Sequence, residues 1–317
     1  MGKKDVEKIV IALGGNAILQ PGQRGTYEEQ LKNVERACEQ IAELVVKGFN
    51  IVLTHGNGPQ VGNILIQNEQ GAKLVPSMPL DVCGAQSQGM IGYMLQRTLK
   101  KALANMGCKA EIATIITQVV VDRQDPSFGN PSKPVGPFYN EETAKAKMAA
   151  GESWIEDANR GWRKVVPSPE PQKIVEAEVI KKLIEAGVLV IASGGGGIPV
   201  VEESDGVYRG VEAVIDKDLA GQRLATEIGA DMFIIHTDVP GVAINYRKEN
   251  ESWLRAVSLE EIRRYEAEGH FKKGSMNPKV KACLRFAELT NKPAVIASLD
   301  KLLEAIEGKS GTRFLPS

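Results

Sequence analysis

The chain has 317 residues, and its 39 Lys and Arg nearly balance its 40 Asp and Glu, so the formal net charge is −1. This balance excludes a global positive field of the kind that draws a protein to nucleic acid or to a membrane surface. No apolar run approaches the ~20 residues of a membrane-spanning helix, and no apolar signal segment follows the first methionine, so we expect a cytoplasmic protein. The cysteines lack CxxC spacing, which favours reduced core thiols at Cys38, Cys83, Cys108 and Cys283.

Apolar segments that predict strands alternate with amphipathic segments that predict helices. Residues 9–13 and 51–54 are apolar, and residues 27–47 between them carry apolar side chains at helical spacing, with Gly48 at the end. Strand, helix and strand in this order form a βαβ unit with parallel strands. The further elements, in chain order, are a helix over 86–106, a strand over 113–121, a helix over 177–185, and strands over 188–192, 233–236 and 294–297. The alternation predicts a doubly wound α/β fold.

A proline-dense stretch interrupts this alternation between Asp122 and Pro171. It holds seven of the chain's 16 prolines and two of its three tryptophans, Trp154 and Trp162. Proline does not fit the interior of a central strand or of a helix, and a break of ~50 residues is too long for a plain loop. The tryptophans favour a folded insert over a disordered one. We therefore expect a small subdomain or lid over residues 123–170.

Three of the expected strands end directly on glycine. In an open α/β sheet, the ligand crevice lies beyond the carboxyl ends of the strands. Glycine has no Cβ, so the backbone N–H groups of these turns can approach an anion closely. Three such junctions on one sheet predict a shared oxyanion or phosphate site, rather than three tight turns or a flexible linker. The expected substrate-binding residues are Gly14, Gly15, Asn16, Gly56, Asn57, Gly58, Gly194, Gly195 and Gly196.

Two lysines stand in the first turns of predicted helices, where they oppose the helix dipole. Asp216 is the expected N-cap before Lys217, and Asn277 is the expected N-cap before Pro278 and Lys279. A bound polyanion would offset the unfavourable placement, because the lysine and the helix end then act on the same negative charge. The two lysines together indicate a phosphate-binding site.

Three further charged residues belong to the same pattern. Lys133 lies in the proline-dense stretch, where closure of a lid could carry its charge onto a reacting phosphoryl group. Asp218 could orient the cationic groups or hold a magnesium–nucleotide. Asp238 follows the strand at 233–236, and its position fits a nucleotide contact or a plain turn equally well.

The glycine turns and the lysine motifs occur together, in one order, along nearly the whole chain. The segments concerned are Ala12–Ala17, Thr54–Gly62, Lys133–Tyr139, Ser193–Pro199, Val214–Ala220 and Gly274–Lys279. In these segments the sequence resembles the carbamate kinases of the amino-acid-kinase superfamily. Many superfamily members carry a lysine in the first strand where this chain has Ala12, and that difference argues against N-acetylglutamate kinase and uridylate kinase.

The resemblance implies a three-layer αβα sandwich with a mostly parallel central sheet and a small protruding subdomain. Residues 1–185 would form the lobe for carbamate or carbamoyl phosphate, residues 186–317 the nucleotide lobe, and residues 123–170 the inserted lid. It also implies that Mg²⁺ accompanies ATP or ADP, that the protein has no metal site of its own, and that the chain forms a homodimer. The implied site residues are the catalytic Lys133, Lys217, Asp218 and Lys279 and the nucleotide-binding Asp216, Thr237, Asp238, Tyr246 and Met276.

The implied reaction is reversible phosphoryl transfer between ATP and carbamate, which gives ADP and carbamoyl phosphate and belongs to arginine metabolism. The sequence leaves open whether the physiological direction is ATP production or carbamoyl phosphate supply. Three alternatives also stay open. One is a kinase of the same superfamily that acts on another small carboxylate, the second is an NAD(P)-dependent oxidoreductase that uses Gly56–Gly62, and the third is a sensor without catalysis.

Overall fold

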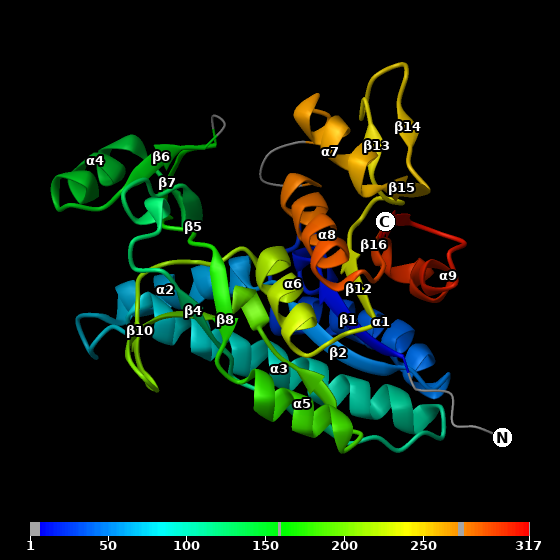
Figure 1. The fold of residues 1–317 in the computed structure, drawn as a ribbon. Helices are drawn as coiled ribbons and strands as arrows, with labels where there is room; N and C mark the ends of the chain where they lie inside the picture. Colours follow the sequence, from blue (N-terminus) through cyan, green and yellow to red (C-terminus); the bar gives the residue numbers. More distant parts are fainter. Residues whose placement is uncertain (1–6, 158–159, 272–275, 317) are drawn as a thin grey trace.

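An eight-stranded sheet forms the centre of the molecule (Figure 1). The computed structural model describes residues 7–157, 160–271 and 276–316. The strand order is β15-β17-β16-β12-β1-β2-β9-β3, and neighbours are parallel except for β16 and β17. In that order the strands are Ala256–Ser258, Thr312–Leu315, Ala294–Ala297, Met232–His236, Lys8–Leu13, Asn50–His55, Leu189–Ile191 and Ile112–Thr114.

Helices cover both faces of this sheet. Along β1, Ile9, Ile11 and Leu13 belong to one apolar core and Val10 and Ala12 to the other, because successive side chains of a strand point to opposite faces. The first core is closed by α1 (Tyr27–Val46), α3 (Leu80–Asn105) and α9 (Leu302–Ile306), and the second by α5 (Ala177–Glu185), α6 (Lys217–Glu227), α7 (Leu259–Ala267) and α8 (Met276–Thr290). The predicted three-layer αβα sandwich with a mostly parallel sheet is confirmed.

The predicted strand over residues 113–121 is wrong, because this segment forms two strands in two sheets. β3 (Ile112–Thr114) is the edge of the large sheet, whereas β4 (Gln118–Val121) belongs to a second sheet of order β11-β10-β4-β8. The Gln88 side chain stabilises the break, since its amide accepts from the Thr117 N–H at 2.8 Å and donates to the Thr117 carbonyl at 3.2 Å. The other strands of this sheet are Pro171–Ile174 (β8), Ile198–Ser204 (β10) and Val207–Gly210 (β11).

Helix α3 begins earlier than predicted. It starts at Leu80, directly after Pro79, instead of at residue 86, and it ends at Asn105. The additional turn buries Leu80 and Cys83, which pack with Val135 and Val166 of the proline-dense stretch. Packing against a segment distant in sequence therefore extends this helix.

The proline-dense stretch folds as a small subdomain that projects from the sandwich, at the upper left of Figure 1. Its antiparallel sheet has the order β5-β7-β6, and α4 (Glu141–Ala149) connects β5 to β6. Trp154 is buried there, and its ring meets Tyr139 edge-on with 5.2 Å between ring centroids. We call this part the inserted subdomain; its strands are Lys133–Tyr139 (β5), Trp154–Glu156 (β6) and Trp162–Val166 (β7).

A helix and a hairpin follow two of the central strands, β2 and β12, in the chain. Helix α2 (Gly58–Gly71) follows β2 directly and packs against β5 of the inserted subdomain. The hairpin of β13 (Ala243–Ile244) and β14 (Ser252–Trp253) stands with α7 at the upper right of Figure 1. Within the described ranges, no helix combines the length and the apolar character needed to cross a membrane.

Candidate active site

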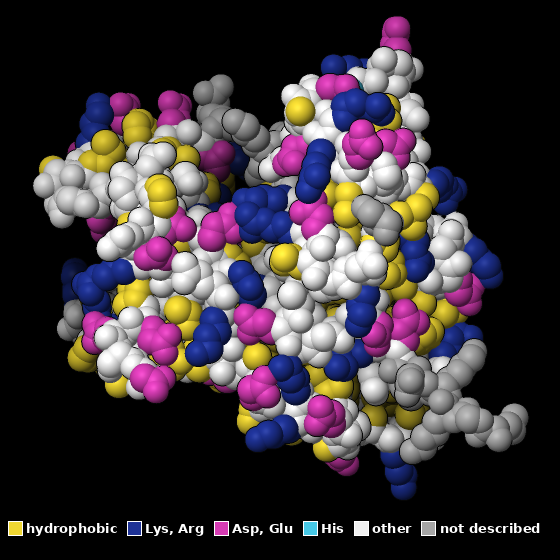
Figure 2. Space-filling model, in the orientation of Figure 1, with side chains coloured by type: hydrophobic (Ala, Val, Ile, Leu, Met, Phe, Trp, Pro, Cys, Tyr) yellow, Lys and Arg dark blue, Asp and Glu magenta, His cyan; other side chains and the backbone are white. Residues whose placement is uncertain are grey.

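The glycine turns meet at one edge of the large sheet. Because β1, β2 and β9 are parallel neighbours, their carboxyl ends lie together, and the following turns line one cavity of about 290 Å³. Gly15, Gly56, Asn57, Gly58 and Gly195 face this cavity, which we call the lysine cavity after the residues described below. Figure 2 shows that the molecular surface is hollowed between the inserted subdomain and the elements around α7, with charged side chains of both signs at the floor of the hollow.

The four-glycine turn after β9 is required by close packing as well as by the cavity. Gly195 has φ +67°, and a Cβ there would collide with the Asn57 amide. A Cβ on Gly194 would collide with the His55 ring. Gly194 and Gly196 are buried and do not line the lysine cavity, so their missing side chains serve the packing of the turn against its neighbours.

Helix α6 brings charged groups to the cavity from its first turn. Asp216 is the N-cap, as predicted, because its side chain accepts from the backbone N–H groups of Asp218 and Leu219. The buried Asp218 carboxylate bridges two ammonium groups, with Oδ1 2.6 Å from Lys217 Nζ and Oδ2 3.1 Å from Lys279 Nζ. Asp218 therefore holds a lysine of α6 and a lysine of α8 at the same wall of the cavity.

Burial and ion pairing shift the pKa values of this cluster. Burial lowers the pKa of Lys217, and the attraction of Asp218 only partly opposes this effect. Burial alone would raise the pKa of Asp218, but Lys217 and Lys279 outweigh it and lower that pKa. Asp218 thus stays ionised at neutral pH and separates two positive charges that would otherwise repel each other.

Lys133 reaches the same cavity from the inserted subdomain. Its Nζ lies 3.0 Å from Asp216 Oδ2, so the contact joins β5 to the N-terminus of α6. The structure thus brings together all three lysines that the sequence singled out, Lys133, Lys217 and Lys279, from three different elements. Their catalytic roles remain predictions.

Arg163 on β7 lines the lysine cavity as well, and sequence reasoning missed it. Its Nε and Nη2 donate to the Gly136 carbonyl at 3.2 and 3.1 Å, and its Nη1 donates to Asp157 at 3.4 Å. The guanidinium also lies 5.2 Å from the centroid of the Phe138 ring. These contacts fix its orientation. The only sequence signal is an arginine beside Trp162, and such a pair is too common to identify a ligand contact.

Other predicted site residues lie away from this cavity. Gly14 is directed toward the neighbouring strand, where its N–H donates to His236 Nδ1 at 3.1 Å. The Asn16 amide donates to the Asp238 carboxylate, and both residues line a separate cavity of about 190 Å³ together with Thr237. The lysine cavity and this second cavity are therefore distinct.

The five residues predicted to bind the nucleotide do not share one cavity, since Asp216 lines the lysine cavity and Thr237 and Asp238 line the second one. Tyr246 is exposed, and its ring packs edge-on against Trp253 with 6.1 Å between centroids. Met276 is the first residue of α8 and packs against the core. The predicted N-cap Asn277 is therefore wrong, because this residue lies inside the first turn, where its amide donates to Glu266 at 3.0 Å. Residues 272–275 of the same motif lie outside the described ranges.

The carboxylate groups that line the lysine cavity are paired with other groups of the protein. They belong to Asp216 and Asp218, and every one of their four oxygens already accepts from a lysine or a backbone N–H. In the part of the chain that the structure describes, no cluster of three His, Cys, Asp or Glu residues could hold a metal ion. Mg²⁺ commonly binds through substrate phosphates, and its arrival with the nucleotide stays a prediction.

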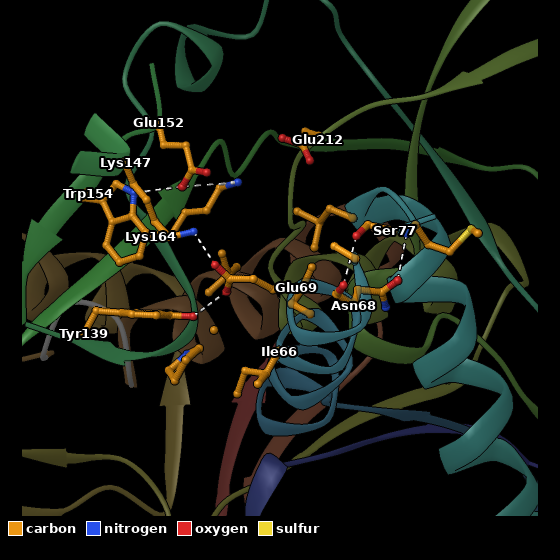
Figure 3. Close-up of a pocket in the computed structure, with 17 residues that line it drawn as sticks. Ile66, Asn68, Glu69, Ser77, Tyr139, Lys147, Glu152, Trp154, Lys164 and Glu212 are labelled. Carbon is orange, nitrogen blue, oxygen red and sulfur yellow. Dashed lines mark hydrogen bonds and ion pairs between the residues drawn. The ribbon is translucent and has the colours of Figure 1, made fainter. Parts of the chain in front are cut away.

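A third cavity, of about 340 Å³, lies between the inserted subdomain and α2 (Figure 3). Val135 lines both this cavity and the lysine cavity. Glu69 of α2 accepts from Tyr139 Oη at 2.9 Å and pairs with Lys147 at 2.5 Å. The hydrogen bond from Lys147 lowers the pKa of Glu69, and burial together with Glu69 raises the pKa of Tyr139 to about 12. Glu69 thus ties the inserted subdomain to the helix whose first residue, Gly58, lines the lysine cavity.

Comparison with known proteins identifies the family of this chain. The model of the amino acid kinase family matches residues 7–298. The chain is 57% identical to a carbamate kinase of Pyrococcus furiosus, with 100% of both chains covered, and 50% identical to a carbamate kinase of Trichomonas vaginalis, with 98% and 100% covered. The solved carbamate kinase from Giardia lamblia bound to AMP-PNP superposes with a TM-score of 0.94 at 48% identity, with 99% of each chain covered. The chain therefore belongs to the amino acid kinase family and, within it, to the carbamate kinases.

Proposed function

We propose that the chain catalyses reversible phosphoryl transfer between ATP and carbamate, which gives ADP and carbamoyl phosphate. The observation that carries the proposal is the Asp218 carboxylate, which holds Lys217 and Lys279 at one cavity with three glycine turns, in a chain 57% identical to a carbamate kinase. The Giardia relative was solved with the nucleotide AMP-PNP, which supports nucleotide use here.

This reaction needs positioning and charge neutralisation more than covalent catalysis. In the proposal, the backbone N–H groups around Gly15 and Gly56–Gly58 orient the carbamate. Lys217 and Lys279 neutralise the oxygens of the phosphoryl group in transfer. Asp218 is a positioning residue rather than a base, because both of its oxygens already accept from lysines.

Lys133 has a separate part in the proposal. It pairs with Asp216 in this structure, and the side chains of the two residues are 36% and 17% exposed, so the pair contributes little stability. We propose that closure of the inserted subdomain exchanges Asp216 for the phosphoryl group as the partner of Lys133. The subdomain would then act as a lid that also excludes water from the reaction.

The two lobes divide the substrates in this proposal. Carbamate or carbamoyl phosphate occupies the lobe of residues 1–185. The nucleotide, with its Mg²⁺, occupies the lobe of residues 186–317, where the proposed contacts are Asp216, Thr237, Asp238, Tyr246 and Met276. An action in the cytoplasm, within arginine metabolism, belongs to the same proposal.

The decisive experiment measures ATP formed from ADP and carbamoyl phosphate in the presence of Mg²⁺. We expect turnover that depends on both substrates and on the enzyme concentration. Turnover with acetyl phosphate but not with carbamoyl phosphate would instead assign a kinase for another small carboxylate. Nucleotide binding without any turnover would favour a sensor and contradict the proposal.

We also propose that the chain forms a homodimer. Val82, Met90 and Tyr93 of α3 and Ile116 after β3 are exposed, and β3 is the edge strand of the large sheet. A surface with exposed apolar side chains beside an open sheet edge suits a second copy of the chain. Light scattering at micromolar concentration should give twice the mass of 34.3 kDa, and a monomer would contradict this part of the proposal.

A further inference from the structure

Asn57 stands at the start of α2 but does not cap this helix with its side chain. It occupies the N-cap position, where the carbonyl oxygen of an asparagine usually accepts from a backbone N–H of the first turn, yet its side chain makes no such hydrogen bond. The residue is only 9% exposed and lines the lysine cavity. Helix capping therefore does not account for an asparagine at this position.

The amide of Asn57 binds Ser87 of α3 instead. Asn57 Nδ2 donates to Ser87 Oγ at 2.8 Å, and Ser87 Oγ donates to the Gly84 carbonyl at 2.6 Å. Ser87 is fully buried and does not line the lysine cavity. Its hydroxyl is therefore available only to groups of the protein.

This pair of hydrogen bonds allows one orientation of the Asn57 amide. A serine hydroxyl has a single hydrogen, and a carbonyl cannot donate, so that hydrogen must lie between Ser87 Oγ and the Gly84 oxygen. Ser87 Oγ can then only accept from Asn57. Nδ2 consequently faces Ser87, and the carbonyl oxygen Oδ1 faces away from it. With the amide turned over, two acceptors would be in contact without a hydrogen between them.

The Oδ1 atom of Asn57 is an acceptor that a ligand can use. Within the described ranges no group of the protein donates to it, and it is not one of the fully buried side-chain atoms that lack a partner, so it can be reached from the cavity. The other side-chain acceptors that line the cavity are the carboxylates of Asp216 and Asp218, which already accept from lysines and backbone N–H groups. A donor on the substrate therefore finds its side-chain acceptor in Asn57.

The substrate of the proposed function carries such a donor. Carbamate and carbamoyl phosphate have an amino group where acetate and acetyl phosphate have a methyl group. The oxygens of all four molecules can accept from the N–H and ammonium groups of the cavity, but only the amino group needs an acceptor. A methyl group in its place would leave Oδ1 buried without a partner, which costs free energy on binding.

We propose that Asn57 selects carbamoyl phosphate, because its Oδ1 accepts a hydrogen bond from the amino group of the substrate. Ser87 is a positioning residue, since it lies outside the cavity and acts by fixing the orientation of the Asn57 amide. This inference rests on the proposed function and names the group that distinguishes carbamoyl phosphate from other small acyl phosphates.

The test compares carbamoyl phosphate with acetyl phosphate in the ATP-forming assay on the intact chain. We expect the kcat/KM of the wild type to favour carbamoyl phosphate by roughly tenfold or more. Asn57→Ala removes the acceptor and should bring the ratio of the two kcat/KM values close to unity. Ser87→Ala keeps Asn57 but no longer fixes its amide, so this ratio should fall by about threefold or more.

A double-mutant cycle shows whether Ser87 acts through Asn57. If it does, adding Ser87→Ala to the Asn57→Ala variant should leave the ratio unchanged. Thr98→Val is the matched control, because it removes a hydroxyl from a nearly buried residue of the same helix that does not line the lysine cavity, and it should keep the wild-type ratio. A general loss of structure lowers activity with both substrates alike, so it does not change the ratio.

Two unreactive analogues measure the same selectivity by calorimetry, without any turnover. Phosphonoacetamide carries the amino group, and acetonylphosphonate has a methyl group in its place. We expect the wild type to bind phosphonoacetamide at least roughly tenfold more tightly than acetonylphosphonate, and Asn57→Ala to remove this difference.

Three results would overturn the proposal. The first is a wild-type chain that does not distinguish the two analogues. The second is a preference for the amino group that Asn57→Ala leaves intact, which would assign it to another acceptor. The third is a change of the ratio by Ser87→Ala that persists when the Asn57 side chain is already removed. Failure to form ATP from carbamoyl phosphate would contradict the proposed function alone, because the analogues still decide the role of Asn57.

Discussion

The Asp218 carboxylate pairs with the ammonium groups of Lys217 and Lys279. Replacing Lys217 therefore removes one positive charge from the cavity and leaves Asp218 with a single ion-pair partner. We expect Lys217→Met to lower kcat in the ATP-forming assay by roughly 10²–10³, because a preorganised charge at the transferred phosphoryl group is lost. The remaining pair of Asp218 and Lys279 keeps the carboxylate partnered, and methionine fills a similar volume, so the chain should still fold.

The matched control for this prediction is Lys182→Met, which changes an exposed lysine on α5 and should leave kcat unchanged. Circular dichroism and the Tm establish that both variants are folded. Near-wild-type turnover of a folded Lys217→Met variant would remove Lys217 from the catalytic machinery.

Arg163 gives a second prediction at the residue scale. A lysine in its place cannot donate two hydrogen bonds to the Gly136 carbonyl while a third N–H reaches Asp157. We expect Arg163→Lys to raise the KM for carbamoyl phosphate roughly tenfold or more, with a smaller change in the KM for ADP. Arg160→Lys is the control, because Arg160 also pairs with Asp157, at 3.0 Å, but does not line the lysine cavity. Equal effects of the two substitutions would mean that Arg163 acts only on the stability of the inserted subdomain.

The limits of prediction at the residue scale have a physical cause. Lys217 and the N-cap Asp216 could be found from the sequence, because a lysine in a first helical turn beside a good capping residue is a local pattern. Arg163 could not, because its orientation depends on the Gly136 carbonyl, 27 residues away. Asn16 and Lys217 line different cavities, and this too depends on the tertiary structure, because the two residues reach the edge of the sheet from different elements.

At the scale of elements, the buried apolar runs of β1, β2 and β12 were predictable, since a strand covered on both faces has to be apolar throughout. The break between β3 and β4 was not predictable, because hydrogen bonds from Gln88 on another element stabilise it. The inserted subdomain was recognisable from its prolines and tryptophans, but its strand order depends on contacts that no local pattern encodes.

The contact of Glu69 with the inserted subdomain leads to a prediction about the whole element. Glu69 accepts from Tyr139 and Lys147, which stand on β5 and α4 (Figure 3). Glu69→Gln should weaken both contacts and loosen the subdomain, because the charge that attracts Lys147 is lost. We expect faster hydrogen exchange in β5 and α4 and a several-fold lower kcat, since Lys133 stands on the same strand as Tyr139.

Glu141→Gln is the matched control for Glu69→Gln. It removes an exposed ion pair with Lys145 within α4, which should change neither exchange in β5 nor kcat. A double-mutant cycle of Glu69→Gln with Tyr139→Phe measures the coupling directly. Additive effects on exchange would show that the Tyr139–Glu69 hydrogen bond does not hold the subdomain in place.

For the whole molecule, two buried histidines at the ends of central strands link stability to pH. Burial lowers the pKa of His55, at the end of β2, and of His236, at the end of β12, to about 4 in each case, from 6.5 in the unfolded chain. Between these values the unfolded state binds more protons than the folded state, so stability falls as the pH is lowered from about 6.5 towards 4.

We expect the free energy of unfolding to fall by about 2 kcal/mol for each of these histidines between pH 7 and pH 5, as measured by urea unfolding. His55→Gln and His236→Gln should each reduce this dependence. The comparison with the wild type is necessary because burial raises the pKa of Glu227, which acts in the opposite sense. Carboxylates with lowered pKa values, such as Asp231, lose their contribution only at lower pH. A variant that keeps the full wild-type dependence between pH 7 and pH 5 would show that its histidine already takes up a proton in the folded sheet.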